Sequence, residues 1–355
     1  MNKTGIISVS VILFIVFAII GNYNIQQMHS GGFYRTDEIN KNLGPVLYYE
    51  EGLYATVTVR ELVGNTKALF INGKGQGGQG ITDLRVNFLL SYLPLLIKPD
   101  ANNALVIGLG TGTTSGQLAQ QIDVTTVEIE SEILGASNYF NSFNLNVLKN
   151  PNHRLLIDDG RNYLLKSEKK YDLIIQEPSD PWQSFSAALY SKEFLELVNE
   201  DLNETGLYVY WIPVYTISPE DFRNFYKTFN EVFPFNVAFA NIKPKENTPV
   251  RFETSEIILV GSKNTLKINP KNFAENYNNL SKNSKQQLDS IKLSSSDEIY
   301  NLLIFTNEQL QEYADAAQFV TDDKPILEFS TAKNVLNQNP KEVINDIERF
   351  IQNKG

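Results

Sequence analysis

The sequence lacks cysteine altogether and contains two histidines, His29 and His153, among its 355 residues. Without cysteine the chain can form neither a disulfide framework nor a thiolate zinc site, and it has no cysteine nucleophile. Two histidines far apart in the sequence also disfavour a histidine-based metal cluster and a Ser-His-Asp triad. We therefore expect no bound metal.

Positive charge is scarce as well. The chain has 31 Lys+Arg against 41 Asp+Glu, which gives a formal net charge of −10. Such a chain lacks the broad positive field on which nucleic-acid binding depends, so no nucleic-acid partner is expected. Cationic small molecules fit this charge better. With 42% hydrophobic residues, the chain is long enough for one large domain or two modest ones.

One long uncharged stretch lies near the amino terminus. Residues 5–21 read GIISVSVILFIVFAIIG, and these 17 residues are at the lower limit for spanning a hydrocarbon core about 30 Å thick. Lys3 precedes the stretch, which does not end in the small-x-small site of a cleaved signal peptide. We expect residues 1–28 to form an uncleaved single-pass transmembrane anchor, with a cleaved signal as the second choice. Lys3 favours a cytoplasmic amino terminus, which would place the rest of the chain outside the cytoplasm. The chemistry inferred below uses a metabolite that is made in the cytosol. We therefore leave open on which side of the membrane the catalytic domain lies.

Residues 29–97 are expected to form a linker and a small β-rich domain. From Val46 to Phe70 apolar and polar residues alternate, which is typical of short strands and hairpins. A glycine-rich loop, Asn72 to Gly80, closes this unit, and the apolar stretch Leu84 to Ile97 indicates a helix.

Residues 98–263 show a different pattern. Apolar runs such as ALVIGLG, VTTVEIE, LLIDD, YDLIIQEP and GLYVYWIPVY alternate with helical stretches. Strands separated by helices predict an α/β fold with a doubly wound parallel sheet, Rossmann-like and of the methyltransferase type. Residues 264–355 are expected to form a solvated helical appendage, with an ordered segment at TDDKPILEF.

Candidate binding residues follow the first two strands of this domain. Glycines after a buried strand allow a ligand to approach the backbone closely. Glu128 ends the next strand, where a carboxylate can accept hydrogen bonds from both ribose hydroxyls. Thr113 stands where a dinucleotide fingerprint would need its last glycine, so a mononucleoside is favoured. The candidate cofactor-binding residues of the loop are Gly108, Gly110, Thr111 and Gly112.

The third and fourth strands are also followed by carboxylates. Asp158, Asp159 and Gly160 follow the third, where an aspartate can accept from the exocyclic amine of an adenine or cap the next helix. Glu177 and Asp180 follow the fourth, in the segment EPSDPW. Two acids there suit binding of an ammonium group and removal of a proton from an attacking amine, although a rigid solvated turn would look the same.

At these residues the sequence resembles the spermidine synthase (polyamine aminopropyltransferase) family, and more closely its bacterial membrane-associated branch. The resemblance covers roughly residues 45–335 and is carried by VIGLGTGTTSG, TTVEIE, LLIDDGRNYLL, YDLIIQEPSDPW, LYSKEFLELVNEDLNETGLYVYWIPVYTISPEDF and TDDKPILEF. The family transfers an aminopropyl group from decarboxylated S-adenosylmethionine to an amine and releases methylthioadenosine. The resemblance implies this reaction, a membrane location and a possible homo-oligomer.

The resemblance also assigns roles to individual residues. Glu128 would hold the ribose, Asp159 the adenine, and Gln76 would close over the nucleoside from the preceding hairpin. Glu177 would orient and deprotonate the attacking amine, and Asp180 corresponds to the second aspartate of the catalytic loop.

Two departures from the family pattern concern specificity. Thr111 stands where the family carries an aspartate that grips the aminopropyl ammonium. The family's Tyr-His-Glu run corresponds to Val86, Asn87 and Phe88, none of which can form an ion pair with a cation.

Three aromatic residues on the expected fifth strand are candidates for an acceptor pocket, because they can bind a cation by cation–π contact. These substrate-binding candidates are Tyr210, Trp211 and Tyr215. The leading hypothesis is an aminopropyltransferase-like enzyme acting on a polyamine or related amine. The alternatives are a methyltransferase using S-adenosylmethionine itself, which Thr111 favours, and a membrane-tethered nucleoside or polyamine sensor without turnover.

Overall fold

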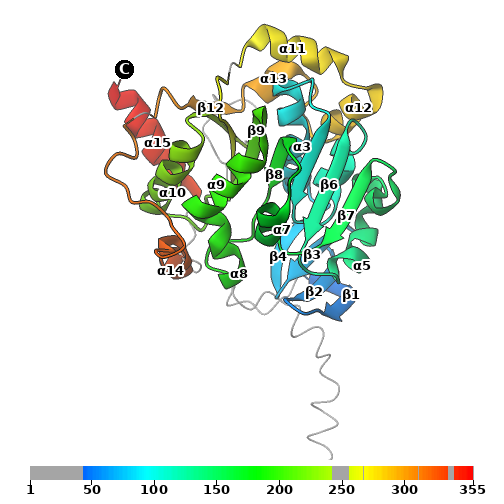
Figure 1. Cartoon of the computed structure of the whole chain (residues 1–355). Helices are drawn as coiled ribbons and strands as arrows, with labels where there is room; N and C mark the ends of the chain where they lie inside the picture. Colours follow the sequence, from blue (N-terminus) through cyan, green and yellow to red (C-terminus); the bar gives the residue numbers. More distant parts are fainter. Residues whose placement is uncertain (1–42, 242–255, 267, 311, 335–339, 355) are drawn as a thin grey trace, which may run out of the picture.

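The computed structural model describes residues 43–241, 256–266, 268–310, 312–334 and 340–354 (Figure 1). The transmembrane anchor expected at residues 1–28 and most of the linker after it lie outside these residues. Within the described part of the chain, no helix is both long enough and apolar enough to cross a membrane.

A small antiparallel sheet comes first in the described chain. Its strands follow one another in space in the order β1-β2-β3-β4. They are β1 (Leu43–Glu51), β2 (Thr56–Leu62), β3 (Lys67–Ile71) and β4 (Lys74–Gly78). The alternation of residues predicted this hairpin unit, and Val57, Val59 and Leu69 are buried on its inner face. The glycine-rich stretch is a strand rather than a loop, because Asn72 and Gly73 both have positive φ and form the tight turn that returns β4 along β3.

The large sheet has the strand order β12-β10-β11-β9-β8-β5-β6-β7. Its strands are β5 (Asn103–Ile107), β6 (Asp123–Glu128), β7 (His153–Ile157), β8 (Tyr171–Gln176), β9 (Leu202–Pro213), β10 (Phe235–Ala240), β11 (Glu256–Ser262) and β12 (Leu303–Thr306). The strands from β9 through β8, β5 and β6 to β7 are mutually parallel. This half of the sheet is the Rossmann-like arrangement that the sequence predicted.

The expectation of a wholly parallel sheet is wrong, because β11 pairs antiparallel with β9, and β10 pairs antiparallel with β11 and β12. An apolar run indicates that a strand is buried but carries no information about its direction. Strand β12 spans four residues, which is too short for a periodic pattern to reveal it.

Helices cover both faces of the large sheet (Figure 1). One layer packs on the face that carries Val106, Ile175 and Trp211. It consists of α3 (Ile81–Ile97), α4 (Thr113–Leu118), α11 (Pro270–Asn279), α12 (Lys282–Ser290) and α13 (Ser296–Tyr300). The other layer packs on the face that carries Leu105 and Tyr210. It consists of α7 (Gly160–Lys166), α9 (Lys192–Asp201), α10 (Pro219–Val232), α14 (Ile326–Asn334) and α15 (Pro340–Lys354).

The stretch after residue 264 is part of this core, contrary to the expected solvated appendage. Phe273 and Tyr277 of α11, Leu288 of α12 and Ile299 of α13 are buried among side chains of the first layer. Few apolar residues are needed, because residues four apart lie on the same face of a helix and form a narrow apolar stripe. The domain boundaries at residues 28, 97 and 263 remain predictions.

The small sheet and the short helix α5 (Ile133–Ser137) lie at the end of the large sheet where its parallel strands terminate (Figure 1). Val57, Val59 and Leu69 pack there with Ile133 and Ala136 of α5. The carboxyl ends of parallel strands are where open α/β sheets bind ligands. The small sheet therefore covers the edge at which a site is expected.

Candidate active site

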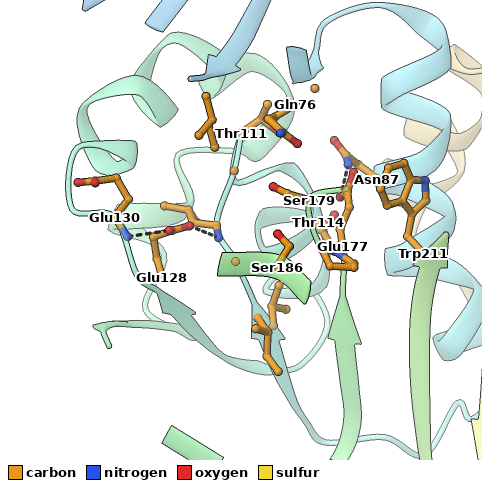
Figure 2. A pocket seen from close by; sticks show the side chains of 18 of the residues that line it. Gln76, Asn87, Thr111, Thr114, Glu128, Glu130, Glu177, Ser179, Ser186 and Trp211 are labelled. Carbon is orange, nitrogen blue, oxygen red and sulfur yellow. Dashed lines mark hydrogen bonds between the residues drawn. The ribbon is translucent and has the colours of Figure 1, made fainter. Parts of the chain in front are cut away.

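A cavity of about 700 Å³ lies between the small sheet and the carboxyl ends of β5, β6 and β8. Figure 2 shows Glu128 and Glu130 on one side of it, and Asn87, Glu177 and Trp211 on the other. The acidic residues that line the cavity are Asp83, Glu128, Glu130, Asp159, Glu177 and Glu256. No lysine, arginine or histidine is among the described residues of the lining. The ionisable acids and bases of the described lining are therefore all acidic, which suits a cationic ligand.

The glycine loop after β5 forms one wall of the cavity. Gly108 and Gly110 have φ of +92° and +53°, and a Cβ atom added at either would meet nothing within 4 Å. Both glycines and Thr111 line the cavity. Gly112 does not line the cavity. It is the N-cap of α4, and a Cβ atom added to it would lie 2.9 Å from Cγ1 of Val147. Gly112 therefore serves the packing of the loop, and its assignment as a binding residue remains a prediction.

Glu128, at the end of β6, is held by the backbone. Its Oε2 accepts from the amide of Leu109 at 2.7 Å, and its Oε1 accepts from the amide of Glu130 at 2.9 Å. Burial raises the pKa of Glu128, while these amide donors oppose that rise. The carboxylate is thereby fixed at the cavity wall beside the glycine loop, which is where the sequence places a ribose-binding group.

Asp158 and Asp159 both follow β7, but only Asp159 lines the cavity. Asp159 and Gly160 line the cavity, and Oδ1 of Asp159 also accepts from the amide of Asn162 at 2.8 Å. Asp159 is thus the N-cap of α7 as well as a lining residue. Asp158 is not part of the lining; its Oδ1 accepts from the amide of Asp159 at 2.8 Å. Asp158 thus supports the turn into the helix, and its assignment as a binding residue remains a prediction.

The β3–β4 hairpin brings Gln76 to the cavity from the small sheet (Figure 2). Its Nε2 atom is buried and has no hydrogen-bond partner among the described residues. Thr111 lies across from the hairpin, with its hydroxyl 2.9 Å from that of Thr113. A buried amide donor without a partner costs free energy, so it marks a place where a ligand would supply an acceptor.

Glu177 directly follows β8 and faces the cavity with part of its surface accessible. Its Oε2 accepts a 3.0 Å hydrogen bond from Nδ2 of Asn87 on α3 (Figure 2). Burial, followed by the negative charges of Asp83 and Glu256, raises the pKa of Glu177 to about 8, although the bond from Asn87 lowers it. A carboxylate with this pKa can take up a proton near neutral pH.

The structure places Asp180 differently from the expected catalytic role. Asp180 is 0% exposed, does not line the cavity, and forms an ion pair with Lys74 of β4. Its Oδ1 also accepts from Oγ1 of Thr216 at 3.1 Å. Lys74 lies over the ring of Tyr215, 5.8 Å from the centroid. Asp180 therefore ties the segment after β8 to the hairpin, and its assignment as a catalytic residue is corrected.

Of the three aromatic candidates, Trp211 and Tyr215 line the cavity and Tyr210 does not. The rings of Trp211 and Tyr215 are 6.4 Å apart. Tyr210 packs on the opposite face of the sheet, 4.9 Å from the ring of Phe225. Successive residues of a strand point to opposite faces, so Tyr210 and Trp211 cannot both reach one cavity. Its assignment as a substrate-binding residue is wrong.

The sequence did not identify Asp83 and Glu256 as parts of the lining. Asn87 was noted only as a residue that cannot form an ion pair with a cation. Asp83 and Asn87 are four residues apart on α3, a spacing that puts both on one helix face. This spacing could have indicated from the sequence that Asp83 lies on the same face of α3 as Asn87. Glu256 begins a strand of the antiparallel part of the sheet, which the sequence did not reveal.

Glu130 was missed as well. Its Oε2 accepts from the amides of Tyr54 and Ala55 at 2.8 and 3.0 Å, which fastens the β1–β2 turn to the large sheet.

The described residues contain no cluster of histidine and carboxylate side chains that could hold a metal ion.

Comparison with known proteins agrees with this geometry. Residues 85–253 match the family model of the spermine/spermidine synthase domain. The chain is 30% identical over 193 residues to a polyamine aminopropyltransferase of Saccharolobus solfataricus, covering 53% of this chain and 64% of the relative. It is 29% identical over 167 residues to a polyamine aminopropyltransferase of Methanocaldococcus jannaschii, covering 46% and 56%. The matches thus span less than two thirds of the length of these relatives.

Solved structures share the fold. A spermidine synthase in complex with the transition-state analogue AdoDATO superposes with a TM-score of 0.58 and 17% identity, covering 75% of this chain and 86% of that one. The spermidine synthase of Thermotoga maritima gives a TM-score of 0.57, with 17% identity and the same coverage. The resemblance drawn from the sequence is confirmed for this domain. Membership of the membrane-associated branch remains a prediction.

Proposed function

Starting from the spermine/spermidine synthase domain in residues 85–253, we propose that the protein is an aminopropyltransferase. It transfers an aminopropyl group from decarboxylated S-adenosylmethionine to a polyamine or a related amine. The observation that supports this reaction most directly is the charge of the cavity, where the described lining carries acidic side chains and no basic one.

This charge favours the decarboxylated co-substrate over S-adenosylmethionine itself. Decarboxylated S-adenosylmethionine carries a sulfonium and an ammonium group, both positive, and an anionic cavity attracts both. S-adenosylmethionine adds a carboxylate, which would enter a site that offers it no cationic side chain among the described residues. Thr111 stands in the glycine loop where the family carries an aspartate, so the loop has one acid fewer. The other acidic side chains of the lining supply negative charge instead.

The described lining also fits the nucleoside part. Gly108 and Gly110 leave open space where any side chain would project, so a ligand can approach the backbone there. Glu128 lies beside this loop and provides carboxylate oxygens for ribose hydroxyls. Asp159 offers an acceptor for an adenine amine, and Gln76 closes the site from the hairpin with an unpartnered amide donor.

Glu177 carries the proton transfer. The neutral acceptor amine attacks the carbon next to the sulfonium, so that a C–N bond forms as the C–S bond breaks. The leaving group is a neutral thioether and needs no acid. Glu177 accepts the proton that the nitrogen gives up, and its raised pKa of about 8 makes the ionised carboxylate a stronger base than an ordinary glutamate.

Binding measurements test the choice of co-substrate. In calorimetric titrations of the full chain, we expect decarboxylated S-adenosylmethionine to bind at least ~10-fold more tightly than S-adenosylmethionine, equivalent to about 1.4 kcal/mol. Equal or reversed affinities would remove the electrostatic support for aminopropyl transfer and favour the methyltransferase alternative.

We propose in addition that residues 5–21 anchor the protein in a bacterial membrane, because this uncharged stretch is long enough to span a hydrocarbon core. After cell fractionation, the full chain should remain in the membrane pellet through an alkaline carbonate wash and leave it in detergent. Release by carbonate alone would contradict the anchor.

A further inference from the structure

The segment TDDKPILEF, residues 321–329, contributes no side chain to the cavity lining, but its first turn is fastened to the helices behind the cavity. The amide of Lys324 donates to the carbonyl of Thr321 at 3.1 Å and closes the turn. The amide of Lys192, at the start of α9, donates to the carbonyl of Val320 at 2.8 Å. The turn is therefore held in a defined place against α9.

Asp322 of this turn forms an ion pair with Arg161 of α7. Its Oδ1 accepts from Nη1 of Arg161 at 2.8 Å, and its Oδ2 accepts from Nη2. The amide of Asp322 donates to Oε2 of Glu193 at 2.9 Å, which attaches the turn to α9 a second time. The hydrogen bonds from Arg161 hold the pKa of Asp322 below its ordinary value, although partial burial opposes this effect. The pair is thus bidentate and ionised at neutral pH.

Arg161 is also a close neighbour of the cavity wall. Asp159 is the N-cap of α7, Gly160 and Arg161 are the next two residues, and Asp159 and Gly160 line the cavity. The hydrogen bonds to Asp322 raise the pKa of Arg161, and the negative charges of Asp322, Glu193 and Asp159 raise it further. Asp159 therefore lies within electrostatic reach of the guanidinium, even though the guanidinium is bonded to Asp322.

Two carboxylates thus compete for one guanidinium. Oδ1 of Asp159 accepts from the amide of Asn162 at 2.8 Å, so a pairing with Arg161 would engage the other oxygen, Oδ2. An adenine amine that needs this acceptor would then have to displace a charged donor. Asp322 prevents the competition, because it offers both oxygens in the planar geometry that a guanidinium prefers.

We propose that Asp322 is a positioning residue for nucleoside binding, which holds Arg161 away from Asp159 and keeps Asp159 open to the adenine amino group. Asp322 touches no ligand and acts only through Arg161, from which it is 161 positions away in the sequence. The inference rests on the proposed function, which assigns the adenine amine to Asp159. It gives the turn of the TDDKPILEF segment a role in the site.

Binding of two uncharged nucleosides tests this role. Methylthioadenosine carries the adenine amine, whereas methylthioinosine has a carbonyl oxygen in its place. Because both ligands are neutral, a change in the overall charge of the protein has little effect on their affinities. In calorimetric titrations of the full chain we expect the wild type to prefer methylthioadenosine by about 10-fold or more, since Asp159 accepts from the amine and repels the carbonyl oxygen.

Asp322→Asn removes the charge that holds Arg161. We expect its affinity for methylthioadenosine to fall about 5-fold, which is the scale of one exposed ion pair. Its preference over methylthioinosine should shrink by at least the same factor, because Arg161 can donate to the carbonyl oxygen of that ligand once it lies beside Asp159.

Arg161→Gln separates this role from a structural one. It breaks the same ion pair but leaves no cation to approach Asp159, so both affinities should stay within about 2-fold of the wild type. The double variant Asp322→Asn/Arg161→Gln should recover the affinity that Asp322→Asn loses. The matched control is Asp323→Asn, which removes the same charge from the next, exposed residue of the turn and should change neither affinity.

The side chains of Arg161 and Asp322 are 26% and 36% exposed, so their replacement should leave the fold intact, which thermal unfolding verifies. Should Asp322→Asn fail to fold, Asp322→Ser decides in its place. A loss of affinity that Arg161→Gln shares, or that the double variant does not recover, would reduce the ion pair to a structural tie and overturn the inference. Wild-type affinity and preference in Asp322→Asn would overturn it as well.

The wild type alone tests the premise of the inference. Equal binding of methylthioadenosine and methylthioinosine would show that Asp159 does not read the amine, which overturns the role of Asp322 and leaves aminopropyl transfer intact. A wild type that binds neither nucleoside would overturn the proposed function itself.

Discussion

Lys74 of the small sheet forms an ion pair with Asp180 of the segment after β8, and the two side chains are 5% and 0% exposed. Thr216 adds a hydrogen bond to the same carboxylate at 3.1 Å. The pair joins the hairpin that carries Gln76 to the segment that begins with Glu177. It therefore couples the position of the hairpin proposed to cover the nucleoside to that of Glu177, the proposed base.

Removing the lysine charge tests this coupling. Lys74→Met would leave Asp180 as an uncompensated charge in the interior, and we expect the free energy of unfolding to fall by about 3 kcal/mol or more. Urea denaturation monitored by circular dichroism measures this change. The double variant Lys74→Met/Asp180→Leu should recover much of the loss, because apolar residues of similar volume replace a buried pair at little cost. A single variant as stable as the wild type would show that the pair does not hold the two segments together.

The raised pKa of Glu177 predicts the pH dependence of turnover. Below its pKa of about 8 the carboxyl is protonated and cannot accept a proton from the amine. The rate should therefore rise with pH through about 8 and level off above it. Initial rates of methylthioadenosine release between pH 6 and about 10 at saturating co-substrate give the profile.

Asp83→Asn serves as the control for this assignment, because it removes a negative charge that raises the pKa of Glu177. The rise in rate should then move to lower pH. Titration of the acceptor amine contributes equally to both profiles, so the difference between them reports on the carboxyl. Identical profiles would show that Glu177 does not govern the pH dependence.

Gly110 of the loop after β5 and Gly116 of α4 distinguish space for a ligand from space filled by packing. At Gly110, a Cβ meets nothing within 4 Å, so Gly110→Ala should cost about 1–2 kcal/mol of backbone strain yet weaken methylthioadenosine binding ~10-fold or more. At Gly116, a Cβ would lie 2.0 Å from the carbonyl oxygen of Asn144, so Gly116→Ala should chiefly destabilise the fold. Calorimetric titration and thermal unfolding of both variants provide the comparison. Full affinity in Gly110→Ala would place the nucleoside elsewhere.

Local patterns were sufficient to predict part of the fold. Alternation in residues 46–70 predicted the small sheet, and apolar runs separated by helical stretches predicted the strands of the parallel half. Strand direction in the antiparallel half depends on pairing between distant segments, such as Ile258 with Trp211, which periodicity does not encode. The polar stretch after residue 264 was predicted to be a solvated appendage, but its few apolar residues are buried in the core.

The candidate site shows the same division. Residues next to strand ends, such as Gly108, Glu128 and Glu177, were predicted because topology brings strand ends together. Tyr210 was assigned to the cavity although the period of a strand places it on the face opposite Trp211. The pairing of Asp180 with Lys74 arises from the tertiary contact between two sheets, and no local pattern in either segment indicates it.

The most direct test of aminopropyl transfer is mass analysis of the products formed from decarboxylated S-adenosylmethionine and a panel of polyamines, with the wild type and with Glu177→Gln. We expect methylthioadenosine together with an amine heavier by one aminopropyl unit. In Glu177→Gln we expect a rate lower by about 10²–10⁴-fold, with methylthioadenosine binding retained, because the acceptor loses its base. A methylated product with S-adenosylhomocysteine, formed when S-adenosylmethionine is supplied instead, would contradict aminopropyl transfer and identify a methyltransferase.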